Sequence, residues 1–149
     1  MVIDSAHCLR NIHRRESKHC DVPQINIGCN SGQQGVFQCE LIVLHCVSLP
    51  AGEFGSGLPS QLFTGTLDIG AHESFASLAG VRVAPHLFID RDGVVEQFVP
   101  FDRPAWHAGE SQWMNRQGCN RFSLGIELEG TWESPFAEAQ YDALLEVCT

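Results

Sequence analysis

The stretch CELIVLHCVSLPAGEFG, residues 39–55, places one histidine, His45, inside an otherwise apolar run. Residues 41–49 are rich in β-branched and large apolar side chains without a clean alternation, which predicts a strand buried on both faces. The glycines and prolines that follow predict a long loop. His45 is therefore either a core histidine bonded to a backbone carbonyl or a metal ligand at a strand end beside a cleft.

Further strands and helices are predicted along the rest of the chain. PHLFI (85–89) and VVEQFV (94–99) are typical of strands, and the Asp92-Gly93 pair between them predicts a tight turn. FSLGIELEG (122–130) predicts another strand, and one or two helical turns are expected over 74–79. A helix is predicted to begin at Ser134-Pro135, with Ser134 as N-cap. Its apolar stripe would comprise Ala137, Tyr141, Leu144, Leu145 and Cys148.

Composition and charge exclude several classes of function. The net charge of -9 disfavours nucleic acids and anionic membranes as partners, because both are themselves negative. No apolar run approaches the roughly 20 residues that span a bilayer, and the first residues lack the apolar segment of a secretory signal. The seven cysteines include no C-x-x-C pair, which suits a reducing compartment. We therefore expect a cytoplasmic protein.

The first 36 residues differ from the rest of the chain. They show little hydrophobic period and predict an irregular N-terminal extension, followed by one domain over residues 37–149. Histidines and cysteines are frequent in the extension, but their spacing matches no known zinc module. A loosely packed extension is thus expected in preference to a second metal site formed by His7, Cys8, His13, His19, Cys20 and Cys29.

Two further stretches carry candidate reactive residues. Glu127 and Glu129 lie two residues apart and so share one face of a regular strand. If Glu127 is buried, its raised pKa suits a general base, whereas the alternative is a solvent-facing carboxylate. Glu129 is expected to face solvent or to bind a structural partner. In the loop AWHAG, Trp106 and His107 would either contact a sugar ring or form a packed loop.

Several motifs in register resemble one known family. The stretches are LIVLHCVSLPAGEFG, LFTGTLD, VRVAPHLFIDRDGVVEQFVPFDRPAWHAG and CNRFSLGIELEG, and they occur in this order over about three quarters of the chain. They resemble the type-2 N-acetylmuramoyl-L-alanine amidases, and most closely the AmpD-type cytosolic 1,6-anhydro-N-acetylmuramoyl-L-alanine amidases of cell-wall recycling. The resemblance implies an α/β (α+β) fold with a mixed central sheet flanked by helices, as in peptidoglycan recognition proteins and T7 lysozyme.

The resemblance also implies the chemistry and the substrate, a muropeptide. His45 falls on the first zinc ligand of the family, and Glu127 on the catalytic glutamate that handles the attacking water. Zinc would polarise the lactyl–alanine carbonyl and acidify its water. Positions that match substrate contacts in the family are Arg82, Trp106, His107 and Asn120.

The chain also departs from the family pattern. The family takes its other two zinc ligands, a histidine and an aspartate, and a lysine from a C-terminal stretch with no counterpart here, so the domain is expected to be incomplete at its C-terminus. Cys46 replaces an asparagine common after the zinc histidine. Three hypotheses remain: a zinc-dependent muropeptide amidase, a non-catalytic binder of peptidoglycan fragments, and an inactive truncated remnant.

Overall fold

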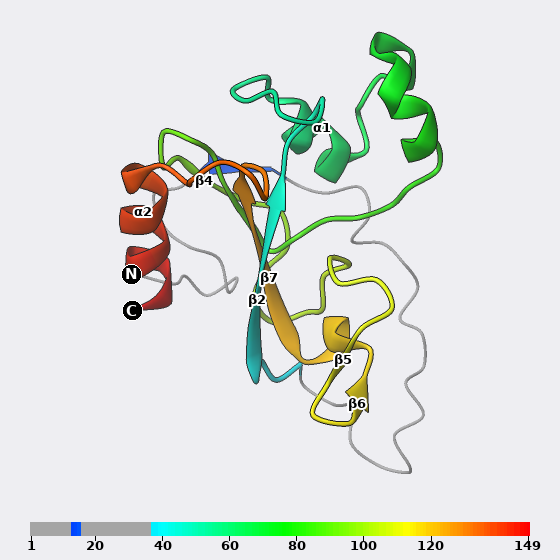
Figure 1. The fold of residues 1–149 in the computed structure, drawn as a ribbon. Helices are drawn as coiled ribbons and strands as arrows, with labels where there is room; N and C mark the ends of the chain where they lie inside the picture. Colours follow the sequence, from blue (N-terminus) through cyan, green and yellow to red (C-terminus); the bar gives the residue numbers. More distant parts are fainter. Residues whose placement is uncertain (1–12, 16–36) are drawn as a thin grey trace.

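A five-stranded mixed sheet forms the centre of the computed structural model, which describes residues 13–15 and 37–149. The strand order is β1 (His13–Arg14), β4 (Val95–Gln97), β3 (Leu87–Ile89), β7 (Ser123–Glu129) and β2 (Leu41–Val47). Strands β3 and β4 are antiparallel, and the other neighbouring pairs are parallel (Figure 1). A separate hairpin consists of β5 (Gln112–Trp113) and β6 (Arg116–Gln117). The predicted mixed α/β fold is confirmed.

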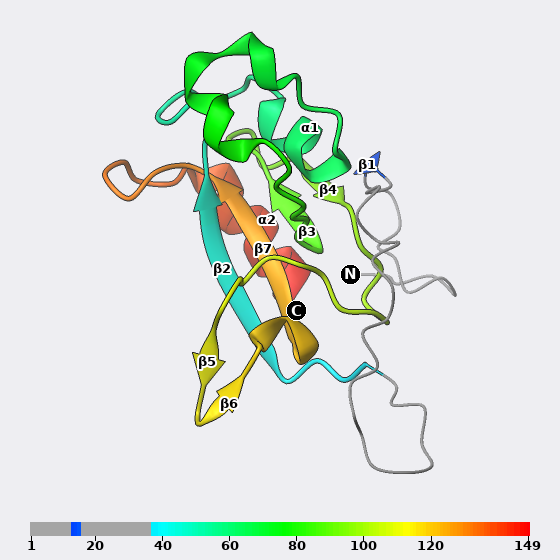
Figure 2. The same cartoon turned by 90° about the vertical axis from the view of Figure 1, so that its right-hand side faces the viewer.

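Helices cover both faces of this sheet. Helix α2 (Glu138–Cys148) lies on one face, and α1 (Leu58–Thr64) lies on the other (Figures 1 and 2). The short 3₁₀ helices are η1 (Ile69–Ala71), η2 (Glu73–Leu78) and η3 (Cys119–Arg121). The core on the α1 face consists of Leu62, Phe63, Ala84, Phe88, Phe98, Val99 and Ala105. The core on the α2 face consists of Leu87, Ile89 and Ile126, with Ala143, Leu144 and Val147 of α2 packed against them.

Strand β2 is an edge strand, so the predicted burial on both of its faces is wrong. Ile42 and Leu44 are 44% and 52% exposed. The physical reason is the position of α2, which packs over β3 and β7 and leaves the same face of β2 uncovered. The apolar run correctly indicated a strand, but burial of both faces requires packed elements on both sides of the sheet, and α2 does not extend over the edge strand.

Helix α2 begins later than predicted, with Ala137 and not Ser134 as its N-cap. The Ser134 hydroxyl forms a hydrogen bond of 2.9 Å with Thr131 Oγ1 and is thereby held outside the helix. The cap comes from within the helix, where Gln140 Oε1 accepts a hydrogen bond from Ala137 N at 3.0 Å. The predicted apolar stripe is wrong in part, because Tyr141, Leu145 and Cys148 are exposed.

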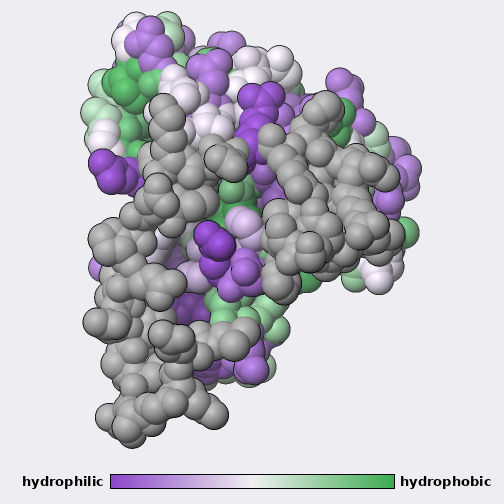
Figure 3. All heavy atoms as spheres, turned by 180° about the vertical axis from the view of Figure 1, so that it is seen from behind, coloured by the Kyte–Doolittle hydropathy of each residue, from purple (hydrophilic) through white to green (hydrophobic). Residues whose placement is uncertain are grey.

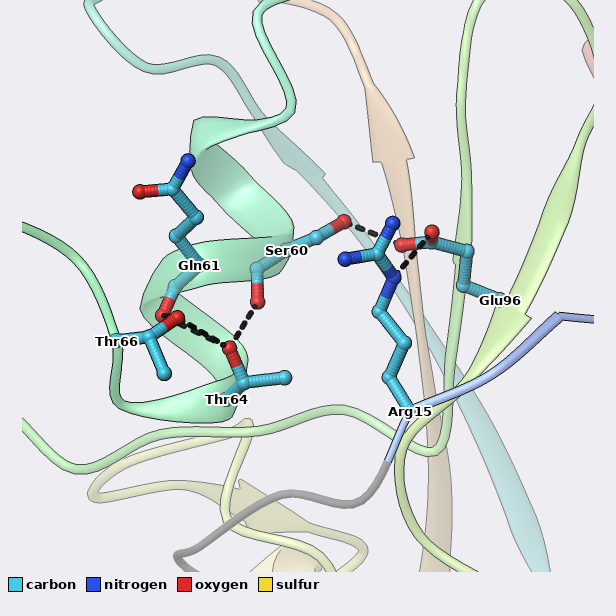
Figure 4. A network of polar contacts seen from close by, with 6 residues as sticks. All are labelled: Arg15, Ser60, Gln61, Thr64, Thr66 and Glu96. Atoms are coloured by element: carbon cyan, nitrogen blue, oxygen red, sulfur yellow. Dashed lines mark hydrogen bonds and ion pairs between the residues drawn. The ribbon is translucent and has the colours of Figure 1, made fainter.

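The short strand β1 is tied to the sheet and to α1 by one buried carboxylate. Arg15 Nε donates to Glu96 Oε1 at 2.6 Å, and the Ser60 hydroxyl of α1 donates to Glu96 Oε2 (Figure 4). Arg15 N also donates to Gln97 O at 3.0 Å. Strand β1 thus lies in a segment whose sequence predicts no regular structure, and Arg15, the residue after it, supplies these contacts. The other candidate ligands of the N-terminal extension lie outside the described residues.

The described surface carries no sign of a membrane span. Hydrophilic and hydrophobic residues are interspersed on the described part of the face seen in Figure 3. Within residues 13–15 and 37–149, no helix has the length and apolar character needed to cross a bilayer.

Two buried polar side chains, Glu129 and Gln140, connect the sheet to the loops at residues 55 and 91 and to helix α2. Glu129 is 1% exposed, and its two carboxylate oxygens accept hydrogen bonds from Gly55 N at 2.7 Å and Arg91 N at 3.2 Å. Gln140 is fully buried, and its Nε2 donates to Ile89 O at 3.2 Å and to Glu129 O at 3.0 Å. Of the two alternatives for Glu129, the structural partner is therefore correct.

The Gln140→Ala variant is expected to lower the free energy of unfolding by about 2–4 kcal/mol, because it leaves buried backbone groups without partners. Urea denaturation followed by circular dichroism measures this loss. The control is Glu146→Ala on the same helix, where the side chain is exposed and the change should stay within about 0.5 kcal/mol. Equal effects for the two variants would contradict an anchoring role for Gln140.

Candidate active site

The pairing of β2 with β7 places His45 directly beside Glu127. The two residues are Cα partners in the parallel ladder, so their side chains point to the same face of the sheet. This is the α1 face, which also carries Phe88. Glu129 pairs with Val47 and shares the face of Glu127, as predicted. Cys46 pairs with Leu128 on the opposite face, so its thiol does not join the site.

Glu127 is a buried carboxyl group with an unsatisfied oxygen. Its Oε2 is buried and has no hydrogen-bond partner among the described residues. Burial raises the pKa of Glu127 to about 7. A carboxyl group with such a pKa exchanges a proton near neutral pH, which is the property required of a general acid or base.

His107 is the hydrogen-bond partner of His45. Nε2 of His45 and Nδ1 of His107 lie 3.0 Å apart, and the two rings meet edge to face with centroids 5.2 Å apart. Burial lowers the pKa of His45. Burial, with smaller contributions from the nearby His45 and His86 rings, lowers the pKa of His107 to about 4. His107 is therefore neutral over the range in which Glu127 titrates, and burial disfavours the charged form of His45 as well.

The ring of His107 occupies space that only a glycine leaves open on β7. A Cβ atom on Gly125 would lie 2.2 Å from His107 Cγ, far inside van der Waals contact. The other ring nitrogen, Nε2, lies 3.3 Å from Ser123 Oγ, and Ser123 Oγ donates to Cys119 O at 2.6 Å. A glycine inside a strand commonly marks such a close approach.

His86 supports this arrangement from the neighbouring strand. Its Nδ1 accepts a hydrogen bond from Gly125 N at 3.0 Å, and its Nε2 donates to Arg103 O at 3.0 Å. Burial lowers the pKa of His86 to about 4. A neutral ring with one donor and one acceptor satisfies both bonds, so His86 joins β7 to the loop before Trp106.

The other sequence-predicted site residues have different surroundings. Asn120 is 6% exposed, and its Oδ1 accepts hydrogen bonds from His107 N at 3.1 Å and Ala108 N at 2.9 Å. It thus anchors the loop that carries His107. Trp106 is half-buried and accepts a backbone hydrogen bond from Ala84 N at 3.0 Å. Arg82 is exposed, two residues before Ala84, and is not part of the hydrogen-bonded histidine group.

The described residues do not complete a metal site around His45. Within the described ranges, no three side chains of the types His, Cys, Asp and Glu gather closely enough to hold a metal ion. Zinc sites in proteins use at least three protein ligands. The described residues around His45 therefore do not fit a zinc ion by themselves.

Sequence reasoning did not identify Ser123, Gly125 and His86 as parts of this arrangement. For Gly125 a signal was present, since a glycine in the middle of an apolar strand suggests close packing of another group. Ser123 and His86 gave no signal, because their partners are distant in the chain.

The chain is similar in sequence to known proteins. Residues 37–149 match the N-acetylmuramoyl-L-alanine amidase family (Amidase_2). The chain is 53% identical over 107 residues to the 1,6-anhydro-N-acetylmuramyl-L-alanine amidase AmpD of Escherichia coli, and 52% identical over 107 residues to that of Citrobacter freundii. These alignments cover 72% of this chain and 58% and 57% of the two relatives. The chain therefore spans less than two thirds of the length of these relatives.

The fold is similar to solved structures as well. A crystal structure of a selenomethionine AmpD derivative superimposes with a TM-score of 0.82 at 41% identity, covering 99% of this chain and 76% of the other. The sequence match extends over every strand of the central sheet except β1, and over the loop that carries His107. The chain belongs to the N-acetylmuramoyl-L-alanine amidase family.

Proposed function

We propose that this chain is the amidase domain of an enzyme that hydrolyses the amide bond between the lactyl group of 1,6-anhydro-N-acetylmuramic acid and L-alanine. The observation that carries the proposal is Glu127, a carboxyl group beside His45 that has a pKa of about 7 and a buried oxygen with no hydrogen-bond partner in the described part of the chain. The names of the relatives supply the substrate, a muropeptide. The net charge and the cysteine usage support a cytoplasmic location and a small-molecule partner.

The proposed step uses Glu127 as the proton carrier. Its carboxylate takes a proton from water while the water oxygen attacks the carbonyl carbon of the amide. When the tetrahedral adduct collapses, the C–N bond breaks and the departing amine of L-alanine receives the proton from Glu127. The products are a free lactyl carboxylic acid and a peptide with a free N-terminus.

Zinc enters the proposal as an expectation from the family resemblance, with His45 as one ligand. The described residues supply no further two ligands beside His45. For that reason no step above is assigned to a metal.

A second candidate function is non-catalytic binding of peptidoglycan fragments. It is favoured by the lack of two further zinc ligands beside His45 among the described residues, so a protein that binds the fragment without hydrolysing it is the alternative. The two functions differ in whether peptide is released.

The first prediction concerns Glu127→Gln. With 1,6-anhydro-N-acetylmuramoyl-L-alanyl peptide and added zinc, the chain is expected to release peptide slowly, and Glu127→Gln to lower that rate by about 10²-fold or more. Mass spectrometry of the released peptide measures the rate, and calorimetric titration measures binding. Glu146→Gln, an exposed carboxylate on α2, is the control and should leave the rate unchanged.

Each outcome of that assay selects one hypothesis. Saturable binding without release supports the non-catalytic binder. Neither binding nor release from well-folded protein supports the inactive remnant. Release that is equal in Glu127→Gln and in the unaltered chain would contradict the role of Glu127.

A second prediction concerns the pH dependence of stability. The folded-state pKa of Glu127, about 7, lies above its ordinary value of 4.5, so the folded state holds the proton more tightly than the unfolded state. Stability from this group is complete below about pH 4.5 and is lost as the pH rises through about 7. Glu127→Gln removes this loss. The variant should therefore gain about 1–3 kcal/mol over the unaltered chain between about pH 5 and about pH 8. Urea denaturation at the two pH values measures the gain, and a constant difference would refute the burial of Glu127.

A third prediction concerns metal content. The purified chain is expected to retain well below one equivalent of zinc after dialysis, because the described residues lack three ligands. Inductively coupled plasma mass spectrometry measures the content, with His45→Ala as comparison. One equivalent that disappears in His45→Ala would overturn the prediction and would place further ligands outside the described residues.

A further inference from the structure

A chain of hydrogen bonds runs from His45 through His107 and Ser123 to the backbone. Nε2 of His45 lies 3.0 Å from Nδ1 of His107, and Nε2 of His107 lies 3.3 Å from Ser123 Oγ. We propose that His107 and Ser123 are positioning residues, which hold Nε2 of His45 and leave its Nδ1 as the ring nitrogen available to a ligand or substrate. This role differs from the one expected from resemblance, in which His107 lines the substrate groove.

The hydrogen bond between Ser123 and Cys119 determines which atom donates in each of the other hydrogen bonds of this series. Ser123 has one hydroxyl proton, which it donates to Cys119 O at 2.6 Å. Ser123 Oγ therefore accepts from Nε2–H of His107. A neutral imidazole carries one proton, so Nδ1 of His107 is an acceptor and His45 donates to it through Nε2–H. The lone pair of His45 is then on Nδ1.

The surroundings of His107 favour this neutral form. Its hydrogen-bond partners are the His45 imidazole, the Ser123 hydroxyl and the Ser123 backbone, and none of them carries a negative charge that would stabilise a cationic ring. The rings of His45 and His86 also lie 5.2 and 6.0 Å from it, centroid to centroid. A charge on His107 would face two further imidazoles in a partly buried space.

The backbone holds the His107 ring at a fixed place along β7. Gly125 provides the space, since a Cβ atom there would lie 2.2 Å from His107 Cγ. Asn120 Oδ1 binds the backbone N–H groups of His107 and Ala108. Strand β7 and the loop that carries His107 thus hold the ring in place, and the ring in turn holds His45 through their hydrogen bond. Orientation of a reacting histidine by the bond that its second nitrogen makes is a general feature of such sites.

The inference rests on the proposed function for the role of His45 as a reacting residue, but its test does not require hydrolysis. The test uses the full chain with ¹⁵N-labelled histidine and long-range proton–nitrogen NMR at a pH above the histidine pKa values. The nitrogen shifts distinguish a protonated from an unprotonated ring nitrogen. In the unaltered chain, His45 and His107 are both expected to be protonated at Nε2 and unprotonated at Nδ1.

The variant Ser123→Ala removes the hydroxyl oxygen that accepts from His107 and leaves His45 unaltered. His107 then keeps only the backbone of Ser123 as a partner on that side, which weakens the preference for this tautomer. The ratio of Nε2–H to Nδ1–H in His45 should fall by a factor of about 5 or more. A purely structural serine would lower stability without moving the His45 nitrogen shifts. Ser123→Thr keeps the hydroxyl and should restore the original pattern.

Ser60→Ala is the matched control, because Ser60 is also buried and also donates through its hydroxyl, to Glu96. It should leave the His45 shifts unchanged. Two results would overturn the inference: an unaltered chain in which His45 is protonated at Nδ1, or a Ser123→Ala variant with the original His45 shifts. The measurement on the unaltered chain needs no variant, so it tests the inference even if Ser123→Ala does not fold. Absence of peptide release would contradict the proposed function alone and would leave these shifts as they are.

Discussion

The parallel pairing of β2 with β7 is the constraint on which the rest of the site depends. Seven consecutive residues of β2 pair with seven of β7. Because side chains alternate between the two faces of a strand, this register alone decides which groups meet. A slip of one residue would move His45 from Glu127 to the level of Leu128 and send its ring to the α2 face. The cores on the two faces oppose such a slip, since Ile126 belongs to the α2 face.

Small residues on β7 matter as much as the reactive ones. Gly125 leaves the space into which the His107 ring fits, and Ser123 accepts from that ring. His86 then uses the backbone N–H of Gly125. One strand therefore organises three histidines that come from three separate segments. This explains how the loop of His107 can be long and still place a ring within 3.0 Å of His45.

The sequence predicted the local features of this fold well. Apolar and β-branched runs located β2, β3, β4 and β7, and the period of two placed Glu127 and Glu129 on one face. It failed where distant residues decide the outcome. The edge position of β2 depends on the reach of α2, and the start of α2 depends on a bond between Thr131 and Ser134. The roles of Asn120 and Ser123 depend on backbone groups that no sequence pattern reveals.

Glu127 and Glu129 show how far environment, and not residue type, determines function. The two glutamates lie on the same strand and the same face, two residues apart. Glu129 is 1% exposed, and each of its oxygens accepts a backbone N–H, so its charge is compensated and it serves as an anchor. Glu127 has a buried oxygen with no hydrogen-bond donor among the described residues, and burial, which is costly for the carboxylate, raises its pKa to about 7. A fold selected for stability alone would give both carboxylates donors. That β7 provides donors for one carboxylate and leaves the other without a donor among the described residues supports the proposed role of Glu127 in proton exchange.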